Sequence, residues 1–251
     1  KNKMKILIIC AGLGSRLGEL TQNNPKCMVK VNNLSILERT ISQLLKNKIC
    51  EDDIILCGGY KHELLPNKFK KVINFEYENT NMMITTILGL EEIKQSNIHE
   101  NVLVLYGDCL YSMEFIDLLF TKIDNSPEVL IPVDLDWREK WVMRYENIYL
   151  DAETLKYNKK NNKLLSIGKK TSIPGDYMGQ FMGSYIIPFL KLDKFILAFN
   201  NLEINLRKKI STTEFFEITK HLLNYYVIPN TNRWTEIDTP RDLKYAKNLF
   251  P

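Results

Sequence analysis

Short apolar segments alternate with amphipathic ones along the first half of the chain, and no other feature of the sequence limits the fold as much. The segments that read as strands are Lys5–Cys10, Asp53–Cys57, Asn101–Tyr106 and Glu128–Val133, and those that read as helices between them are Thr85–Lys94 and Ser112–Ile123. Strands that alternate with helices favour a mostly parallel sheet with helices packed over it. The sequence therefore predicts an α/β fold.

A capping box predicts one more helix in this half. In Ser35-Ile36-Leu37-Glu38, the serine side chain and the glutamate three residues later can each bond a backbone N–H that has no partner inside the helix. The apolar residues of that helix then fall on one face, namely Leu37, Ile41, Leu44 and Leu45.

The character of the sequence changes at Leu135. Tyrosine, tryptophan and lysine become dense up to about Gln180, and the segments Asn147–Leu150 and Lys163–Ile167 suggest small antiparallel strands. The elements expected after them are a strand at Gln180–Ile187, helices at Phe189–Asn200 and Thr213–Asn224, and a helix that begins at Thr239-Pro240. We expect one domain over residues 4–251, with a lid inserted at about 135–180.

Composition excludes several classes of protein. The longest apolar runs, such as Ile6–Ala11, are far shorter than the roughly 20 residues that span a bilayer, so no membrane insertion is expected. A net charge of +4, dispersed along 251 residues, does not suggest a nucleic-acid partner. Five cysteines, without a C-x-x-C pair or a histidine at metal-ligand spacing, fit reduced thiols in the cytoplasm.

The segment Ala11–Leu17 is the richest in functional signals. It follows the first strand directly, where α/β sheets bind ligands, and its two glycines let backbone N–H groups approach a phosphate. Arg16 can grip phosphate oxygens with two hydrogen bonds, and Lys26 adds a mobile charge. A dinucleotide fingerprint would need glycine in place of Leu17, and a P-loop would need Gly-Lys-Ser/Thr. The alternative is a tight turn with a surface arginine and lysine.

Two aspartates are expected at the ends of strands. Asp108 follows Leu105-Tyr106-Gly107, and Asp238 ends Glu236-Ile237-Asp238 just before the last helix. Two carboxylates that converge on one edge of a sheet suit Mg²⁺ beside phosphates. The alternative is that each acid is a helix cap or a solvated turn residue.

Together these motifs resemble the nucleotidyltransferase family that makes activated sugars and phosphocholine. The resemblance covers nearly the whole chain and is loose between about 130 and 210. It implies a Rossmann-like sheet of the GT-A-like nucleotidyltransferase type with an inserted acceptor lid. The segment Tyr77–Met82 is similar to one that cytidylyltransferases place near the nucleotide, which favours CTP. The resemblance further implies a role in capsule or surface polysaccharide modification.

By this resemblance, Arg16 and Lys26 would hold the triphosphate and act in catalysis with Asp108 and Asp238, which would ligate Mg²⁺. The residues that would line or shape the nucleotide pocket are Ala11, Gly12, Gly14, Ser15, Gly58, Gly59, Thr80 and Asn81. An acceptor phosphate would attack the α-phosphorus and displace pyrophosphate. Such a phosphate is already anionic near neutral pH, because its second pKa is about 6, so no general base is needed.

The expected lid concentrates aromatic and charged side chains. The residues expected to contact the acceptor are Trp137, Arg138, Lys140, Trp141, Arg144, Glu153 and Tyr177. Aromatic rings would suit a quaternary ammonium, Glu153 an amino group, and the cations a carboxylate or phosphate. Glutamine phosphate would use all three kinds of contact and is preferred to phosphocholine. The alternative is that both tryptophans are core residues and the charges are solvated.

Three other functions stay open. A sugar-1-phosphate nucleotidyltransferase belongs to the same class, although a cationic lid does not favour a sugar. Within the same reaction, 2-aminoethylphosphonate stays open as an alternative acceptor. A non-catalytic nucleotide-binding regulatory module would not need both aspartates, and a glycosyltransferase would not need Pro25-Lys26 after the glycine loop. The oligomeric state is open as well, a homo-oligomer included.

Overall fold

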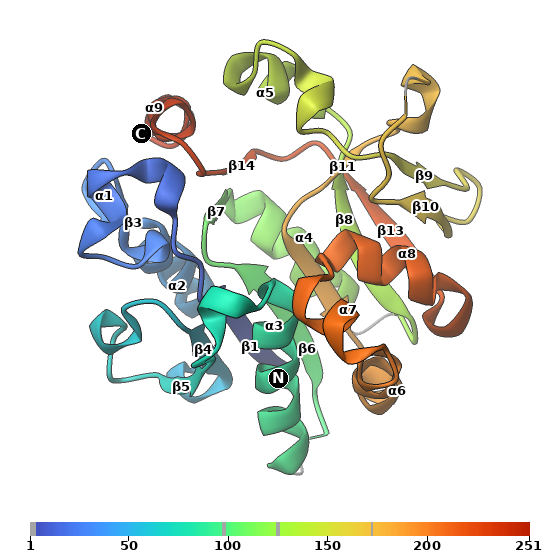
Figure 1. Ribbon diagram of the computed structural model, residues 1–251, viewed down its shortest axis with the longest axis horizontal. Helices are drawn as coiled ribbons and strands as arrows, with labels where there is room; N and C mark the ends of the chain where they lie inside the picture. The colour runs from blue at the N-terminus through green and yellow to red at the C-terminus, as the bar shows by residue number, and fades with distance from the viewer. Residues whose placement is uncertain (1–3, 97–98, 124–125, 172) are drawn as a thin grey trace.

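The computed structural model describes residues 4–96, 99–123, 126–171 and 173–251, and within them one eight-stranded sheet forms the centre of the fold (Figure 1). Its strands are β1 (Met4–Cys10), β4 (Ile54–Gly58), β5 (Lys70–Ile73), β6 (Asn101–Tyr106), β8 (Val129–Asp134), β11 (Gln180–Phe181), β12 (Ser184–Ile187) and β13 (Tyr225–Asn230). The strand order is β11-β8-β12-β6-β1-β4-β5, and β13 pairs with β8. Because β11 and β12 alone run antiparallel to their neighbours, the sheet is mixed and mostly parallel, as predicted.

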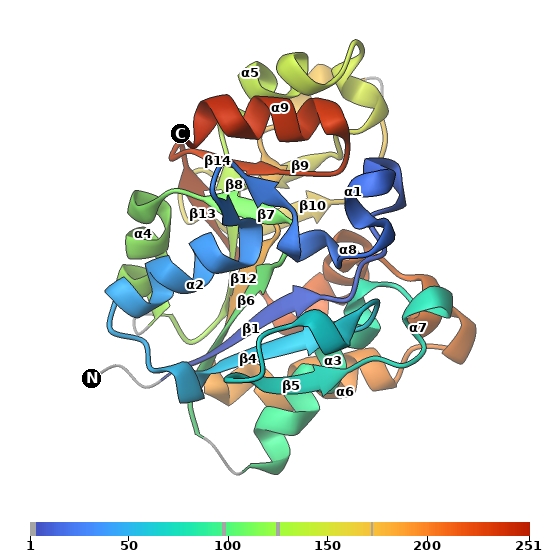
Figure 2. The same cartoon turned by 90° about the vertical axis from the view of Figure 1, so that its left-hand side faces the viewer.

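Helices cover both faces of this sheet (Figure 2). Successive side chains along β1 point to opposite faces, and each set packs against a different group of helices. Ile6 and Ile8 pack in one apolar cluster with α2 (Ile36–Lys46) and α4 (Met113–Ile123). Leu7 and Ile9 point to the other face and pack with α3 (Met82–Gln95), α6 (Phe189–Asn200) and α8 (Thr212–Leu223). A strand buried on both faces reads as a continuous apolar run, which is the pattern that predicted it.

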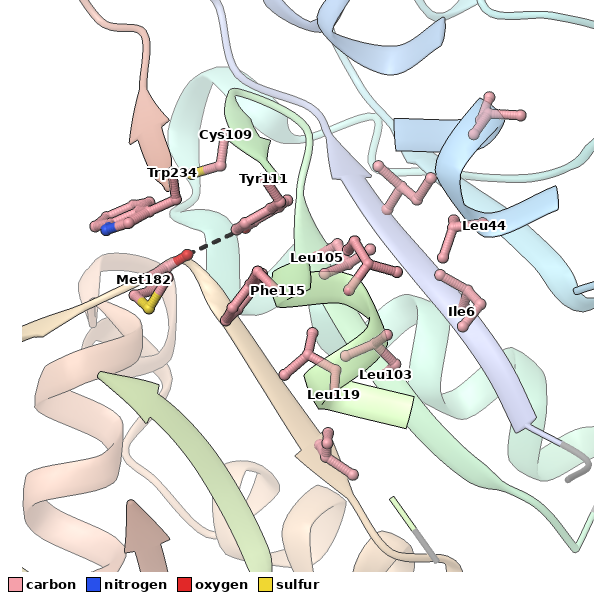
Figure 3. Packing of buried hydrophobic residues seen from close by; sticks show 14 of the residues in the cluster. Ile6, Leu44, Leu103, Leu105, Cys109, Tyr111, Phe115, Leu119, Met182 and Trp234 are labelled. Atoms are coloured by element: carbon pink, nitrogen blue, oxygen red, sulfur yellow. Dashed lines mark hydrogen bonds between the residues drawn. The ribbon is translucent and has the colours of Figure 1, made fainter. Parts of the chain in front are cut away.

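The first of these clusters extends to the segment that follows β6. Figure 3 shows Leu44 of α2 near Ile6, and Phe115 and Leu119 of α4 near Leu103 and Leu105. The hydroxyl of Tyr111 donates to the carbonyl of Met182 at 3.1 Å, inside the core. The segment after β6 is therefore fixed by apolar packing and by the hydrogen bond from Tyr111 to Met182.

Small sheets and short helices complete the fold. The small sheets pair β2 (Lys30–Val31) with β3 (Leu34–Ser35), β7 (Cys109–Tyr111) with β14 (Trp234–Glu236), and β9 (Leu155–Tyr157) with β10 (Leu164–Ile167). The remaining α-helices are α1 (Glu19–Gln22), α5 (Trp137–Arg144), α7 (Ile204–Lys209) and α9 (Pro240–Leu249). Among the described residues, every helix is too short or too polar to cross a bilayer.

One predicted strand was wrong, and another is interrupted. Asn147–Leu150 holds a 3₁₀-helix at Ile148–Leu150, because the Asn147 side chain accepts a hydrogen bond from the Tyr149 N–H and closes a local turn. The single strand predicted at Gln180–Ile187 is broken at Gly183, whose φ of 63° leaves the extended region. A Cβ at Gly183 would lie 2.8 Å from the Cys109 sulfur, so the break brings two chain segments together.

Candidate functional site

Lys26 lies between the two aspartates predicted to hold a metal. Its ammonium group is 2.7 Å from Asp108 Oδ2 and also forms an ion pair with Asp238 Oδ1. The side chain of Lys26 is buried, and both carboxylates are half-buried. Arg16 Nη2 lies 3.1 Å from Asp238 Oδ2, and this arginine is exposed. All four residues that the sequence analysis placed in catalysis therefore meet at one point.

A small sheet brings the two aspartates together. Strand β7 continues the chain after Asp108, and it pairs with β14 through registers such as Glu236 opposite Cys109. The backbone N–H of Ile237 then donates to the carbonyl of Asp108 at 2.9 Å. The sequence signal for each aspartate was local, but their proximity depends on this pairing of distant segments.

The charges at this point stabilise one another. Burial alone would lower the pKa of Lys26, but Asp108 and Asp238 outweigh it and hold that pKa well above the usual range. Burial would raise the pKa of Asp238, and Lys26 and Arg16 lower it instead. Lys26 therefore carries a positive charge, and Asp238 a negative one, at neutral pH.

Gly14 allows the loop after β1 to pass close to Lys26. Its φ of 65° lies in the left-handed region, and a Cβ there would lie 2.9 Å from Thr21 Cγ2 and 3.1 Å from Lys26 Cβ. The hydroxyl of Thr21 fixes the turn by donating to the Gly14 carbonyl at 2.8 Å. By contrast, apart from its two chain neighbours, no heavy atom of the described residues lies within 4 Å of a Cβ placed on Gly12. Space for a ligand is therefore open at Gly12, while Gly14 is required by packing.

A pocket of about 300 Å³ lies beside this loop. Its lining residues are Ile9, Ala11, Gly12, Leu13, Tyr77, Glu78, Thr80, Asn81, Met82 and Thr85. Of the residues predicted for the nucleotide, Ala11, Gly12, Thr80 and Asn81 line it, and Ser15 lines a neighbouring surface pocket. Gly59 lies behind the pocket wall, since a Cβ on it would lie 2.8 Å from that of Tyr77 and 2.9 Å from that of Ala11. Gly58 does not line the pocket, and a Cβ on it would meet Leu65 and His62 instead.

Asn74 holds the wall of this pocket, and the sequence analysis missed it. Its side chain is buried and its amide donates to Thr80 Oγ1 at 3.0 Å and to Thr85 Oγ1 at 2.9 Å. Its carbonyl oxygen accepts from the Glu76 N–H at 3.0 Å. No local pattern separates such an asparagine from a turn residue, because its partners lie on the following loop and helix.

A second pocket, of about 270 Å³, adjoins the first, and Asn81 and Met82 line both. Four carboxylates line the second pocket, from Asp151, Glu153, Glu236 and Asp238. Its other lining side chains are the aromatic residues Tyr106, Trp141 and Phe181 and the polar residues Gln180, Ser211, Thr212 and Thr213. Among the described residues, no lysine or arginine lines it. The second pocket is therefore acidic and partly aromatic.

The structure brings two of the seven predicted acceptor residues, Trp141 and Glu153, to this acidic pocket. The indole N–H of Trp141 donates to Asp151 Oδ2 at 2.9 Å. Burial raises the pKa of Glu153, while Thr213 and Lys170 act in the opposite direction. Burial also raises the pKa of Glu236 to about 7, against the effect of Arg144.

The other five predicted acceptor residues do not line the pocket. Trp137 is fully buried, and the Tyr177 hydroxyl donates to the Thr171 carbonyl at 2.8 Å inside the lid. Lys140 is buried against Asp134, at 2.7 Å. Arg138 is exposed, and its guanidinium lies 4.6 Å from the centre of the Trp137 ring. These four side chains therefore serve the packing of the lid.

Arg144, the fifth of these residues, is also buried, and it binds carboxylates of the chain itself. Its Nε lies 2.7 Å from Asp242 Oδ1, and its Nη2 lies 2.8 Å from Glu236 Oε1. The ring of Trp141 lies 4.9 Å from its guanidinium carbon. Because two carboxylates already bind its guanidinium, Arg144 is not available to bind an acceptor.

Two polar residues of the lid had no signal in the sequence. The amide of Gln180 bonds both backbone groups of Glu153, accepting from its N–H at 3.0 Å and donating to its carbonyl. The ammonium of Lys170 donates to three successive carbonyls, those of Leu150, Asp151 and Ala152, at 2.8–3.0 Å. Both residues fix the backbone that carries the pocket acids.

The residues at Lys26 fit a divalent cation bound together with phosphates. No group of three or more metal-ligating side chains occurs among the described residues, so the protein supplies no complete cage. Mg²⁺ usually binds through one or two carboxylates and the phosphates of a substrate. Asp108 and Asp238 supply two carboxylates, which already share one cation, the ammonium of Lys26.

Comparison with known proteins relates the chain to nucleotidyltransferases. Residues 6–171 match the family model of the MobA-like NTP transferase domain. A CTP:phosphoglutamine cytidylyltransferase from Campylobacter jejuni is 31% identical in an alignment that covers 96% of this chain and 98% of that protein.

Solved structures share the fold at low sequence identity. A CTP:phosphocholine cytidylyltransferase from Streptococcus pneumoniae superimposes with a TM-score of 0.72 at 21% identity, over 99% of this chain and 100% of its own. A putative glucose-1-phosphate thymidylyltransferase from Bacillus anthracis gives a TM-score of 0.74 at 15% identity, over 98% and 95%. The mixed sheet with its covering helices is thus an arrangement these enzymes share.

Proposed function

This chain belongs to the family of MobA-like NTP transferase domains, and from that premise we propose that it transfers CMP from CTP to a small phosphorylated acceptor. It is a nucleotidyltransferase. One observation carries the proposal for its site: Lys26, Asp108, Asp238 and Arg16 meet beside two adjoining pockets, one next to the glycine loop and one lined by acids. The first would hold the nucleotide and the second the acceptor.

The transfer needs positioning and charge neutralisation more than proton transfer. A phosphate oxygen of the acceptor attacks the α-phosphorus of CTP, the bond from that phosphorus to the α,β-bridging oxygen breaks, and pyrophosphate leaves with the electron pair. The cations of Arg16 and Lys26 would stabilise the charge that develops on the leaving phosphates. Mg²⁺, held by Asp108 and Asp238, would neutralise phosphate charge when bound.

The acidic pocket supports an acceptor with a positively charged end. Glu236 and Asp238 already pair with Arg144 and Lys26, so Asp151 and Glu153 are the acids that would attract an ammonium group. The rings of Tyr106, Trp141 and Phe181 would favour the same charge. Glutamine phosphate, our preferred acceptor, carries an amino group, and phosphocholine carries a quaternary ammonium. The relative from C. jejuni is named for phosphoglutamine, which supports the first. A sugar-1-phosphate would bring no cation to Asp151 and Glu153.

The proposal is tested by measuring pyrophosphate release from CTP, UTP, ATP and dTTP against four acceptors, with and without Mg²⁺. The acceptors are glutamine phosphate, phosphocholine, 2-aminoethylphosphonate and glucose-1-phosphate. We expect turnover with CTP and an ammonium-bearing acceptor, fastest with glutamine phosphate and dependent on Mg²⁺. Turnover confined to glucose-1-phosphate would contradict the acceptor assignment and keep nucleotidyl transfer. Binding of CTP without turnover in any combination would favour a regulatory module.

Glu153 should make acceptor binding depend on pH. Because burial raises its pKa, Glu153 becomes neutral at a higher pH than an exposed glutamate does, and its attraction for an ammonium is lost as the pH falls through that range. We expect Glu153→Gln to raise the KM for glutamine phosphate by about tenfold at neutral pH, the usual cost of a charged hydrogen bond. KM measured from pH 5 to pH 8 should rise toward low pH in the wild type and vary less in the variant.

Glu146→Gln is the matched control, because Glu146 is an exposed acid of the same lid and lies outside the pocket lining. It should leave the KM and its pH dependence unchanged. An equal effect of both substitutions would mean that the lid's total charge, and not contact with Glu153, attracts the acceptor.

We also propose that the enzyme works in the cytoplasm, that the segment 135–180 acts as its acceptor lid, and that its CDP-linked product serves surface polysaccharide modification. All five cysteines are free thiols, which fits a reducing compartment.

A further inference from the structure

Asp242 makes more contacts than its place in a helix cap requires. It is the third residue of α9, and with Thr239 it forms a capping box, its Oδ2 accepting from the Thr239 N–H at 2.8 Å. The same Oδ2 also accepts from the Asp238 N–H at 3.0 Å. Its Oδ1 accepts from Arg144 at 2.7 Å, and the side chain is fully buried. One carboxylate therefore fixes the backbone on which Asp238 is carried.

Arg144 is linked to Asp238 through two acids, Glu236 and Asp242. Its Nη2 binds Glu236, two residues before Asp238, and its Nε reaches Asp238 through Asp242. Arg144 ends α5, the helix that carries Trp141 into the acidic pocket, and α5 packs beside α9 (Figure 2). The guanidinium of Arg144 thus connects the lid directly with Glu236 and, through Asp242, with Asp238.

From these contacts we infer that Asp242 and Arg144 are positioning residues, which hold the Asp238 carboxylate where it can bind a cation together with Asp108. The inference rests on the proposed function, because it assigns Asp238 to the metal. It differs from a stability role in one respect: a cap alone would have no effect on metal affinity. The neighbours of a metal ligand usually set its orientation, and their loss weakens metal binding.

Another capping box of the chain supplies a matched control. In α2, Glu38 bonds the Ser35 N–H at 2.7 Å, as Asp242 bonds that of Thr239. Within the described part of the chain, no further contact links Glu38 to the site. Glu38→Gln removes the charge from one capping box, and Asp242→Asn removes it from the other. Both variants lose the charge of a capping box. A difference in Mn²⁺ affinity between them therefore reports the contacts of Asp242 to Asp238 and Arg144.

The experiment titrates Mn²⁺ into the full chain in the presence of CTP, without acceptor, and follows free Mn²⁺ by electron paramagnetic resonance. We expect Asp242→Asn to weaken Mn²⁺ binding by about tenfold to a hundredfold. Glu38→Gln should stay within about twofold of the wild type. Thermal unfolding of each variant, followed by circular dichroism, shows which ones are folded.

Arg144→Lys keeps the inference testable if Asp242→Asn does not fold. Lysine keeps one charge beside Asp242 but lacks the planar fork that binds Glu236 at the same time. We expect weaker Mn²⁺ binding in this variant as well, by a smaller factor. Wild-type affinity in a folded Asp242→Asn or Arg144→Lys variant would overturn the assignment of that residue. A wild-type protein that binds no Mn²⁺ with CTP would overturn the metal site itself, which is a failure of the proposed function.

Discussion

Asp108→Asn should abolish Mg²⁺-dependent pyrophosphate release and leave the protein folded. The substitution removes one of two carboxylate charges at the proposed metal site, while Lys26 keeps Asp238 as a partner. Loss of a residue that only supports a metal ligand already costs roughly 10–100-fold, so loss of a ligand should cost at least about a hundredfold. The measurement is kcat with CTP and the best acceptor across a Mg²⁺ titration.

Asp53→Asn is the control for this variant. Asp53 pairs with Lys5 at 2.6 Å, as Asp108 pairs with Lys26, but it lies just before β4 and away from the glycine loop. The control should retain wild-type kcat and Mg²⁺ dependence. Normal activity of a folded Asp108→Asn protein would place the metal at other residues.

Lys26→Ala should depress kcat by about a hundredfold to a thousandfold, with a smaller effect on the KM for CTP. Removing one preorganised group that stabilises developing charge has an effect of this size. The structure supports such preorganisation, because Lys26 is buried, charged and held between two carboxylates before any substrate binds. A stabilising contact that strengthens in the transition state lowers kcat when it is removed, whereas uniform binding changes KM alone.

Lys5→Ala gives the comparison for Lys26→Ala, since Lys5 is a second buried lysine paired with an aspartate. It should have wild-type kinetics even if its unfolding temperature falls. An unchanged kcat with weaker CTP binding in Lys26→Ala would show that this lysine only holds the ground-state triphosphate.

Strands β1, β4, β6 and β8 were predictable because they are largely buried and read as unbroken apolar runs, as in Ile6–Ile9. The capping boxes at Ser35 and Thr239 were predictable as well, because the pattern that reveals them is local. The break at Gly183 was not, because it depends on the approach of Cys109 from another strand. Strands β5 and β13 and helices α5 and α7 were not predicted either.

The candidate site, like the fold, was predictable where the signal is local and not where it depends on distant residues. Arg16, Lys26, Asp108 and Asp238 could be found from motifs next to strand ends, and the structure brings them together. The cations of the lid could not be assigned, since a free lysine and a buried ion pair have the same sequence. Arg144, for example, finds its partner Asp242 98 positions further along the chain. Burial and pairing, which decide whether a charge is available to a ligand, are tertiary properties.

The pairing of β7 with β14 has a consequence for the synthesis of this protein. Lys26 and Asp238 are separated by 212 positions, and translation at 5–20 residues per second needs roughly 10 to 40 s to cover them. The glycine loop and Asp108 therefore leave the ribosome well before β14 can pair with β7 and bring Asp238 to them. Until β14 pairs with β7, the site that we propose lacks Asp238, and the chain would not turn a nucleotide over. Catalytic activity thus reports that the β7–β14 ladder has closed, and it can serve as an assay for completion of folding.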